Sequence, residues 1–424
     1  MQQRMISLVG LFAMVGIAWL LSSHRKRISW RIVAGGIFLQ FVLAVLVFYT
    51  PPGRHIFQAM GNCFTQLLGF VDVGTGLVFD IYPRDDDVYD PPFPPTFTLL
   101  RSFAFGVLPT IIFFSSLMAI LYHLGIMQRI VTLFAWVMQK TLNTSGAESL
   151  SAAANIFVGQ TEAPLVVRPY VMEMTQSELM AVMVGGFATI AGGVMALYVQ
   201  FGMDPSHLMT ASVISAPAAL LIAKVMIPET EHPKTLGAVE IPLGHDTANV
   251  IEAAAQGATD GMKLSLNVAA MLIAFLALIA MLDAMIAWAG VPLGFVGEQQ
   301  LTLATILGYL FAPLAWLMGI EGRDCLRAGE LLGLKMAANE LVAYARLSEW
   351  LRPNSGVELS ERTQLILTYA LCGFANFGSI GIQIGGIGGI APTRRADLAK
   401  LGLRAMLGGT LAAFMTACVA GVLL

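Results

Sequence analysis

The sequence predicts an all-α polytopic membrane protein with about eight transmembrane helices and two re-entrant hairpins, arranged as an inverted-topology repeat. Composition, long apolar runs and a repeated pattern predict this fold class. Hydrophobic residues make up 57% of the 424 residues and charged residues only 12%, against about 25% charged in a soluble domain. So few charges could not cover the surface of a soluble protein of this size. The composition therefore excludes a cytosolic globular enzyme, a nucleic-acid-binding protein and a disordered scaffold.

Eight apolar runs are long enough to cross the hydrocarbon core of a bilayer. The first run could instead be a signal peptide, but basic residues follow it and no small-residue cleavage site does. We therefore expect it to be a retained span. The predicted spans are 5–21, 32–49, 103–124, 179–201, 206–227, 264–290, 363–386 and 405–424.

Basic residues predict the orientation in the membrane. Arg25, Lys26, Arg27 and Arg31 lie between the first two spans, and short basic loops stay in the cytoplasm. We therefore expect the N-terminus outside, and counting the crossings places the C-terminus outside too. The basic link at 390–404 agrees with that count. The compact ends, without long cytosolic tails, lead us to expect a multi-pass protein of the bacterial inner membrane, which is the plasma membrane.

Residues 51–100 are expected to form an outer loop. Within it, residues 71–97 hold six aspartates against one arginine. The Pro-Pro-Phe-Pro-Pro stretch at 91–95 cannot be helical. We expect the aspartates to be a solvated acidic surface, with calcium binding as the alternative.

Two apolar segments are interrupted by polar residues. Residues 145–177 contain a polar centre at 160–162 together with two prolines, and residues 322–360 contain Asn339 and Glu340. A pair of broken apolar segments at corresponding positions points to the binding site of a transporter. We expect both to be re-entrant hairpins, one entering from each side of the membrane.

A short motif occurs twice. Residues 186–188 and 373–375 both read Gly-Phe-Ala, and each motif lies downstream of a broken segment that carries a glutamate. By the count of crossings, the two spans that contain the motif run in opposite directions. The two halves are therefore predicted to be antiparallel copies. Coincidence is the alternative, because 42 of the 424 residues are glycine.

Two glutamates at membrane depth are the first candidates for a site. A charged side chain at the bilayer centre costs at least about 2.5–3.5 kcal/mol. Glu162 and Glu340 lie at the expected hairpin tips. They could accept hydrogen bonds from a polar solute, carry protons or bind a cation. Capping of a broken helix is the alternative for each.

Uncharged polar residues lie at the same depth. They are Gln160, Thr161, Asn376 and Ser379. Together they suit a neutral, hydroxyl-rich solute better than an anion, because no intramembrane arginine or lysine converges on them. Thr189 occupies the position in the first repeat that Asn376 has in the second. Its hydroxyl and the exposed carbonyls of a broken helix would suit a hard cation such as sodium. A hydroxyl bonded back to its own helix is the alternative.

Two other classes of protein find little support. An intramembrane enzyme would need a nucleophile with a base or a metal motif, and no HExxH, GxSxG or phosphate-binding glycine-rich loop occurs in the sequence. A passive pore would show polar rings along several spans, whereas the polarity is concentrated at two hairpins and two spans. We therefore expect a transporter without an organic cofactor.

Five ordered stretches resemble the concentrative nucleoside transporter family. They are 105–125, 155–165 (NIFVGQTEAPL, the first hairpin), 263–275, 339–344 (NELVAY, the second hairpin) and 372–381 (CGFANFGSIG, the following broken span). The resemblance covers roughly residues 5–424 and is weakest at 51–100. It implies a secondary active transporter that imports nucleosides such as uridine by sodium symport. It also implies a homotrimer in the lipid bilayer, with a scaffold and an elevator-type transport domain in each subunit.

The resemblance further implies four segments and a set of site residues. The segments are 1–125 (N-terminal spans, part of the scaffold), 126–228 (first transport repeat), 229–297 (amphipathic linker and scaffold span) and 298–424 (second transport repeat). Each transport repeat comprises an interfacial helix, a hairpin, a broken span and a last span.

The implied site residues are as follows. Gln160 and Thr161 contact the base with Glu162 near it, Glu340, Asn376 and Ser379 hold the ribose, and Val194, Leu266 and Phe374 line the pocket. Backbone oxygens of Asn155, Val158 and Ile190, with the Thr189 hydroxyl, bind sodium. Gly193 stands where many relatives are expected to have a serine, so the base preference stays open. Proton coupling through Glu162 or Glu340 stays the alternative to sodium.

Overall fold

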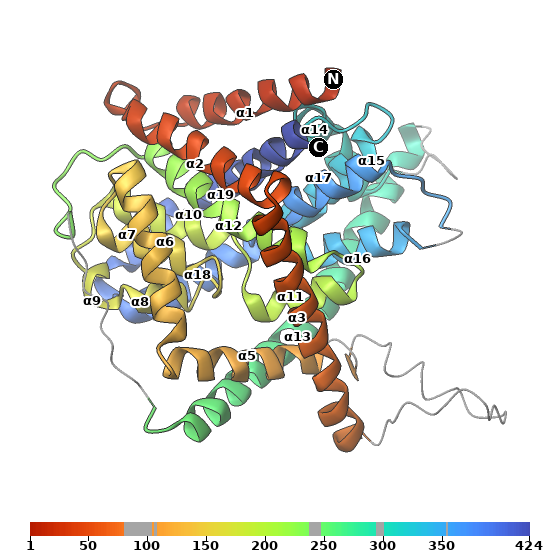
Figure 1. Cartoon of the computed structure of the whole chain (residues 1–424). Helices are drawn as coiled ribbons and strands as arrows, with labels where there is room; N and C mark the ends of the chain where they lie inside the picture. Colours follow the sequence, from red (N-terminus) through yellow and green to blue (C-terminus); the bar gives the residue numbers. More distant parts are fainter. Residues whose placement is uncertain (80–103, 106–107, 237–246, 294–300, 353–354) are drawn as a thin grey trace.

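The described protein is built from helices (Figure 1). The computed structural model describes residues 1–79, 104–105, 108–236, 247–293, 301–352 and 355–424, and no strand occurs in these residues. The helices are α1 (Gln2–Leu20), α2 (Trp30–Tyr49), α3 (Pro51–Phe79), α5 (Leu108–His123), α6 (Ile126–Leu142), α7 (Gly146–Ala154), α8 (Ala163–Val166), α9 (Arg168–Val171), α10 (Gln176–Ala188), α11 (Gly192–Gln200), α12 (Pro205–Met226), α13 (Val250–Gly290), α14 (Leu303–Leu317), α15 (Cys325–Ala337), α16 (Glu340–Trp350), α17 (Glu361–Leu371), α18 (Phe377–Ile390) and α19 (Arg395–Leu423).

Five helical spans in the described residues are long and apolar enough to cross a membrane. They are α1, α2, α10 with α11, α12, and the last helix, all at positions that the sequence predicted. The other three predicted spans are also helical, but with different limits. α5 has 16 residues, α13 is a single helix of 41 residues that includes much of the expected linker, and α17 and α18 are two separate helices. The chain is a multi-pass membrane protein.

The expectation of a loop over 51–100 is wrong for its first part. Residues Pro51–Phe79 form the 29-residue helix α3. Pro51 and Pro52 lie in its first turn, where backbone amides have no partner within the helix, so proline fits there. The proline-rich stretch and most of the predicted acidic surface, together with the calcium alternative, fall at 80–103, outside the described residues.

The two halves of the chain repeat one order of elements. α6, the hairpin from α7 to α9, the broken pair α10–α11 and α12 correspond to α14, the hairpin α15–α16, the broken pair α17–α18 and α19. The order of these elements confirms the two predicted hairpins and the two broken spans.

A sharp bend of 79° separates α5 from α6. It lies at Gly125, whose φ of 73° is in the left-handed region.

Hydrogen bonds along α1 show that the repeats are inverted. At the end of α1, the amide of Ser23 donates to the carbonyl of Met226, at the end of α12 (2.9 Å). At the start of α1, the guanidinium of Arg4 donates to the carbonyl of Leu424, just after α19 (2.6 Å). The last helices of the two repeats therefore end on opposite sides of the protein. The same bond places both chain termini on one side, as Figure 1 shows.

The two broken spans touch each other at their repeated motifs. Gly373 has a φ of 128°. A Cβ at this position would lie 2.8 Å from the carbonyl oxygen of Phe187 and 3.0 Å from that of Ala188. Glycine is therefore required at this position for two reasons: the backbone conformation, and the close approach of the backbone of α10. The break in α17–α18 rests directly on the end of α10.

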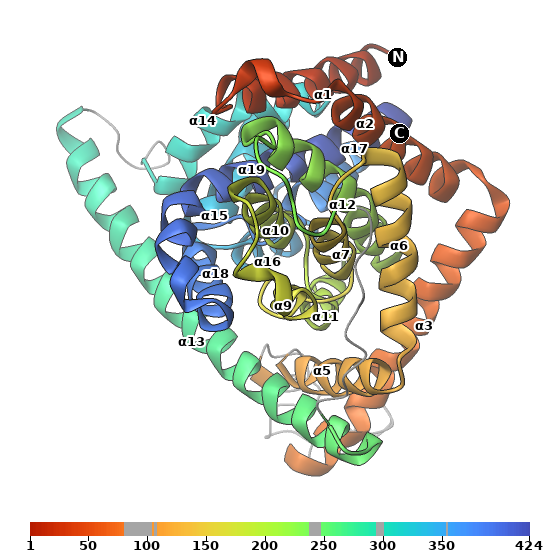
Figure 2. The same cartoon turned by 90° about the vertical axis from the view of Figure 1, so that its left-hand side faces the viewer.

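α5 and α13 form a pair that lies beside the main helix assembly (Figure 2). Small residues let the two helices approach closely. A Cβ on Gly257 or Gly261 would lie 2.7 Å from atoms of α5, and the Ser116 hydroxyl donates to the carbonyl of Ala254 at 2.9 Å. Small residues commonly make such close contacts between membrane helices. By contrast, α1 and α2 pack against α12 and α19 of the repeats.

A buried ion pair joins three elements of the first repeat. The ammonium of Lys224, at the end of α12, lies 2.6 Å from a carboxylate oxygen of Glu148 in α7, and both side chains are almost fully buried. The same ammonium lies 3.0 Å from the Ser177 hydroxyl of α10 and 3.1 Å from Glu229. Glu148 also accepts the backbone amide of Ser145 at 2.7 Å. These contacts hold the N-terminal ends of α7 and α10 and the C-terminal end of α12 together.

Replacing Lys224 by methionine is expected to destabilise the protein strongly, because it leaves the buried carboxylate of Glu148 without a cation. Breaking a buried pair in this way costs about 3–5 kcal/mol. Thermal unfolding of the purified protein measures the loss. Lys234→Met is the matched control, since its pair with Glu173 is exposed and should contribute about 0–1 kcal/mol. Equal melting temperatures for the two variants would contradict the expectation.

Candidate functional site

Polar side chains of both repeats meet at the first turn of α18. Asn376 caps this helix by accepting the backbone amide of Ser379 (2.8 Å). Its Nδ2 donates to one carboxylate oxygen of Glu340 at 3.1 Å, and the hydroxyl of Tyr198 donates to the other at 3.1 Å. Glu340 is the first residue of α16, whose amides are capped by Asn339. Asn339 supplies the side-chain cap of α16, and the carboxylate of Glu340 is held by two side-chain donors.

The tip of the first hairpin reaches the same turn of α18. Nε2 of Gln160 donates to the hydroxyl of Ser379 at 3.1 Å. Oε1 of Gln160 accepts from Nε2 of Gln383, one helical turn further along α18 (3.1 Å). Thr161 packs against Gly386, where a Cβ would lie 2.9 Å from the threonine methyl. One face of α18 therefore carries the contacts of hairpin 1.

Helix ends shape the electrostatics of this cluster. α16 and α18 both begin here, and the N-terminal end of a helix carries a partial positive charge. That charge favours the carboxylate of Glu340 and electron-rich hydroxyl oxygens. The buried ammonium of Lys335, in the same hairpin, donates to the carbonyl of Ala370 at the end of α17 (2.9 Å), where a cation complements the negative helix end. This lysine was not predicted from the sequence, which led us to expect no intramembrane lysine close to the polar residues; Lys335 is buried and interacts electrostatically with Glu340.

The other predicted pocket residues differ in exposure. Val194 is buried, Thr161 and Phe374 are half-buried, and Glu162 is exposed next to the tip at Gly159. Glu162 stands at the start of α8 without a side-chain capping bond. Leu266 lies on α13, and 62% of it is exposed. The hydrogen bonds of the described residues therefore join Gln160, Glu340, Asn376 and Ser379, whereas Leu266 is on a separate helix pair.

The four predicted ion ligands are all buried at the break between α10 and α11 and at the turn after α7. The Thr189 hydroxyl donates to the carbonyl of Gly185 at 2.9 Å. This is the bond back to its own helix that the sequence left as the alternative, and it still leaves the hydroxyl oxygen able to accept. Among the described residues, no hydrogen bond reaches the carbonyl oxygens of Asn155, Val158 or Ile190. The side-chain oxygen of Asn155 is also buried without a partner. This neighbourhood is rich in oxygen atoms with unused lone pairs.

Sequence reasoning missed two residues of the cluster, and both carried a detectable signal. Gln383 lies four residues after Ser379 and seven after Asn376, so it shares their face of α18. Tyr198 lies four residues after Val194 on α11, and its hydroxyl reaches across to the second repeat. A tyrosine or glutamine at membrane depth normally needs a hydrogen-bond partner. Helical spacing from a predicted site residue would have identified both.

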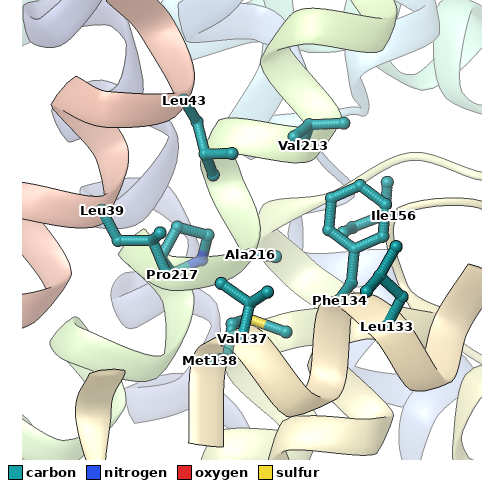
Figure 3. A pocket seen from close by; sticks show the side chains of 10 residues that line it. All are labelled: Leu39, Leu43, Leu133, Phe134, Val137, Met138, Ile156, Val213, Ala216 and Pro217. Atoms are coloured by element: carbon teal, nitrogen blue, oxygen red, sulfur yellow. The ribbon is translucent and has the colours of Figure 1, made fainter. Parts of the chain in front are cut away.

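A separate cavity of about 190 Å³ lies between α2, α6 and α12 (Figure 3). Its lining is entirely apolar and includes Leu39, Phe134, Val137, Ile156 and Pro217. A polar solute would lose its hydrogen bonds to water there without replacement. This cavity is therefore poorly suited to a polar solute.

The inverted repeat, the broken helices and the polar cluster at their ends define a secondary transporter. Family models agree and are more specific. The Na+ dependent nucleoside transporter N-terminus matches residues 9–81, a nucleoside recognition region matches 104–204, and the Na+ dependent nucleoside transporter C-terminus matches 207–421. The chain belongs to the Na+ dependent nucleoside transporter family, whose members are transporters and not enzymes.

Relatives cover the whole chain. An uncharacterized transporter of Haemophilus influenzae is 47% identical over 98% of this chain and 97% of its own length. Solute carrier family 28 member 3 of the rat is 44% identical over the full chain, which spans 59% of that protein. The structure of CNTnw in an inward-facing substrate-bound state is 43% identical, with a TM-score of 0.89 over 99% of this chain and 97% of that chain. The fold class predicted from the sequence is confirmed.

Proposed function

We propose that this protein imports nucleosides such as uridine by sodium symport. The observation that carries the proposal is the polar cluster at the first turn of α18, to which both hairpins contribute. A solute bound there touches both halves of the inverted repeat. Sodium is a co-transported substrate, and no organic cofactor takes part.

The cluster fits the two parts of a nucleoside. Glu340 accepts two hydrogen bonds through separate oxygens, as a pair of ribose hydroxyls would require. Asn376 and Ser379 add one group each beside it. Gln160 and Thr161, with Glu162 near them, face the base, while Val194, Phe374 and Leu266 provide apolar walls. A nucleoside replaces the bonds between Gln160 and Ser379 and between Asn376 and Glu340, so the site opens without leaving polar groups unpaired.

The unused oxygens near Thr189 support sodium as the coupling ion. A hard cation prefers oxygen ligands. The carbonyls of Asn155, Val158 and Ile190 accept no hydrogen bond from the described residues, and the Thr189 hydroxyl can accept. The name of one relative, the mouse sodium/nucleoside cotransporter 1, which is 41% identical, points the same way. Sodium binds first and orders the hairpin tip, which then presents Gln160 to the solute.

An elevator-like movement carries the site across the membrane. α5 and α13 pack on each other and make the scaffold, whereas the repeats pack tightly among themselves and with α1 and α2. For α1 and α2 we therefore propose the moving body, in place of the scaffold that the sequence led us to expect for the whole of residues 1–125. The exposed apolar residues of α13, such as Ile273 and Trp288, suit lipid or a second copy, consistent with a homotrimer. Both termini face outside in the bacterial inner membrane.

Radiolabelled uridine uptake into proteoliposomes tests the coupling ion. An inward sodium gradient is expected to drive uridine above equilibrium, and an inward proton gradient at symmetric sodium is not. Accumulation with protons only would transfer the coupling role to Glu162 or Glu340. Simple equilibration under both gradients would indicate facilitated diffusion. If the protein is folded and no uridine enters, the assignment of uridine as a substrate is contradicted.

Replacing Thr189 by valine is expected to raise the sodium concentration for half-maximal uptake at least about tenfold, because one ligand to a charged species is lost. Thr189→Ser keeps the hydroxyl and should behave like the wild type. The measurement is uridine uptake as a function of sodium concentration. Equal sodium dependence in the valine and serine variants would remove Thr189 from the ion site.

A further inference from the structure

Gln383 is a fully buried glutamine that joins both repeats. Its side chain, on α18, has 0% exposure. Nε2 donates to the backbone carbonyl of Met183 in α10 and to Oε1 of Gln160 in hairpin 1, both at 3.1 Å. Its Oε1 has no hydrogen-bond partner among the described residues. The residue therefore connects α10, α18 and the hairpin tip that faces the solute.

The contact with Met183 determines which way two amides point. The two ends of a side-chain amide have similar shapes but opposite hydrogen-bonding character. A backbone carbonyl can only accept, so the end of Gln383 that faces Met183 must be its NH2 group. The other hydrogen of that group goes to Gln160, so the end of Gln160 that faces it must be the oxygen. The NH2 group of Gln160 is then directed to Ser379.

A glycine makes room for this chain of amides. A Cβ on Gly186, in α10, would lie 2.8 Å from Nε2 of Gln383 and 2.9 Å from Cβ of Gln160. Any larger residue would push the two glutamines away from α10. The first Gly-Phe-Ala motif thus supports the site by close packing, just as the second supports the crossing of the broken spans.

We infer that Gln383 is a positioning residue that sets the base specificity of the transporter by fixing the amide of Gln160 with its NH2 group toward the solute. The inference rests on the proposed function. A donor held in this way favours a base that presents an acceptor, such as the carbonyl oxygen at C4 of uridine. Cytidine carries an amino donor at the same place on its ring. The fixed amide therefore favours uridine over cytidine.

Gln383→Met tests the inference, because methionine has a similar length and no hydrogen-bonding amide. The freed Gln160 amide can turn over and accept from an amino group. We expect the KM ratio of cytidine to uridine to fall about fivefold, the effect of one net hydrogen bond, with Vmax changed less than about twofold. A residue that only supports the fold would lower Vmax for both nucleosides and leave the ratio unchanged.

Gln40→Met is the matched control. Gln40, on α2, is also fully buried, its Nε2 donates to a backbone carbonyl (Gly36, 3.1 Å), and its Oε1 has no partner. It has the same chemistry without a contact to Gln160, so its KM ratio should equal that of the wild type. Gly186→Ala alters no polar group and is expected to shift the ratio in the same direction as Gln383→Met.

The outcomes separate two failures. A ratio within about twofold of the wild type in Gln383→Met overturns the inference alone, provided that the wild type transports both nucleosides. If that variant does not fold, the ratio in Gly186→Ala decides in the same way. A wild-type protein that takes up neither nucleoside overturns the proposed function, and the inference with it.

Discussion

Replacing Glu340 by glutamine is expected to weaken uridine binding and, with it, concentrative uridine uptake. The two carboxylate oxygens of Glu340 accept from Tyr198 and Asn376. A glutamine presents one NH2 group, which must face one of these donors or one ribose hydroxyl that needs an acceptor. Each hydrogen bond to a charged group is worth about 1.5–3 kcal/mol. Uridine affinity should therefore fall roughly 10- to 100-fold, as 1.4 kcal/mol is about a factor of ten.

Calorimetric binding of uridine to the purified protein measures this affinity, and uptake into proteoliposomes measures transport. Glu349→Gln is the matched control, since Glu349 lies on the same helix and pairs at the surface with Arg346. It should keep wild-type binding. Unchanged uridine affinity and uptake in Glu340→Gln would remove Glu340 from the ribose role.

Replacing Gly373 by alanine is expected to destabilise the fold more than Gly186→Ala, the other glycine-to-alanine substitution described above. At a φ of 128°, a non-glycine residue costs about 1–3 kcal/mol in backbone strain. The new methyl would also lie 2.8 Å from a backbone oxygen of α10. Backbone cannot move aside as a flexible side chain can, so the two costs add.

The melting temperature of the purified variant, with and without uridine, is the measurement. Gly381→Ala provides the control, because Gly381 lies within α18 and a Cβ there meets no atom within 4 Å. Alanine is the better helix former, so this control should be neutral or slightly stabilised. Equal melting temperatures for Gly373→Ala and Gly381→Ala would show that the contact between the broken spans can relax.

The sequence predicted the elements that depend on local composition. Long apolar runs such as 206–227 located spans because length and hydropathy are properties of one segment. The hairpins were predictable because polar residues such as Asn339 and Glu340 interrupt apolar stretches. α3 was missed because the prolines and aspartates downstream dominated the reading of 51–100, although Pro51 and Pro52 fit the start of a helix.

Contacts between distant segments could not be predicted in the same way. The bond from Tyr198 to Glu340 joins residues 142 positions apart, and the bond from Gln383 to Gln160 joins residues 223 apart. No local pattern specifies such a pair, because the contact depends on how two inverted repeats cross. The buried Lys335 was missed for a related reason, since its partner is a backbone carbonyl at the end of α17.

The contact at Gly373 has a thermodynamic consequence. Thr189 and Ile190 follow directly after the part of α10 on which Gly373 rests, while Phe374 and Asn376 follow directly after Gly373. The proposed ion and solute positions are therefore joined by one shared wall, the backbone contact between Gly373 and the end of α10. Whatever free energy sodium adds to uridine binding through this wall, uridine must return equally to sodium binding. A substitution that weakens only the coupling should reduce the effect of sodium on uridine affinity and the effect of uridine on sodium affinity by one common factor.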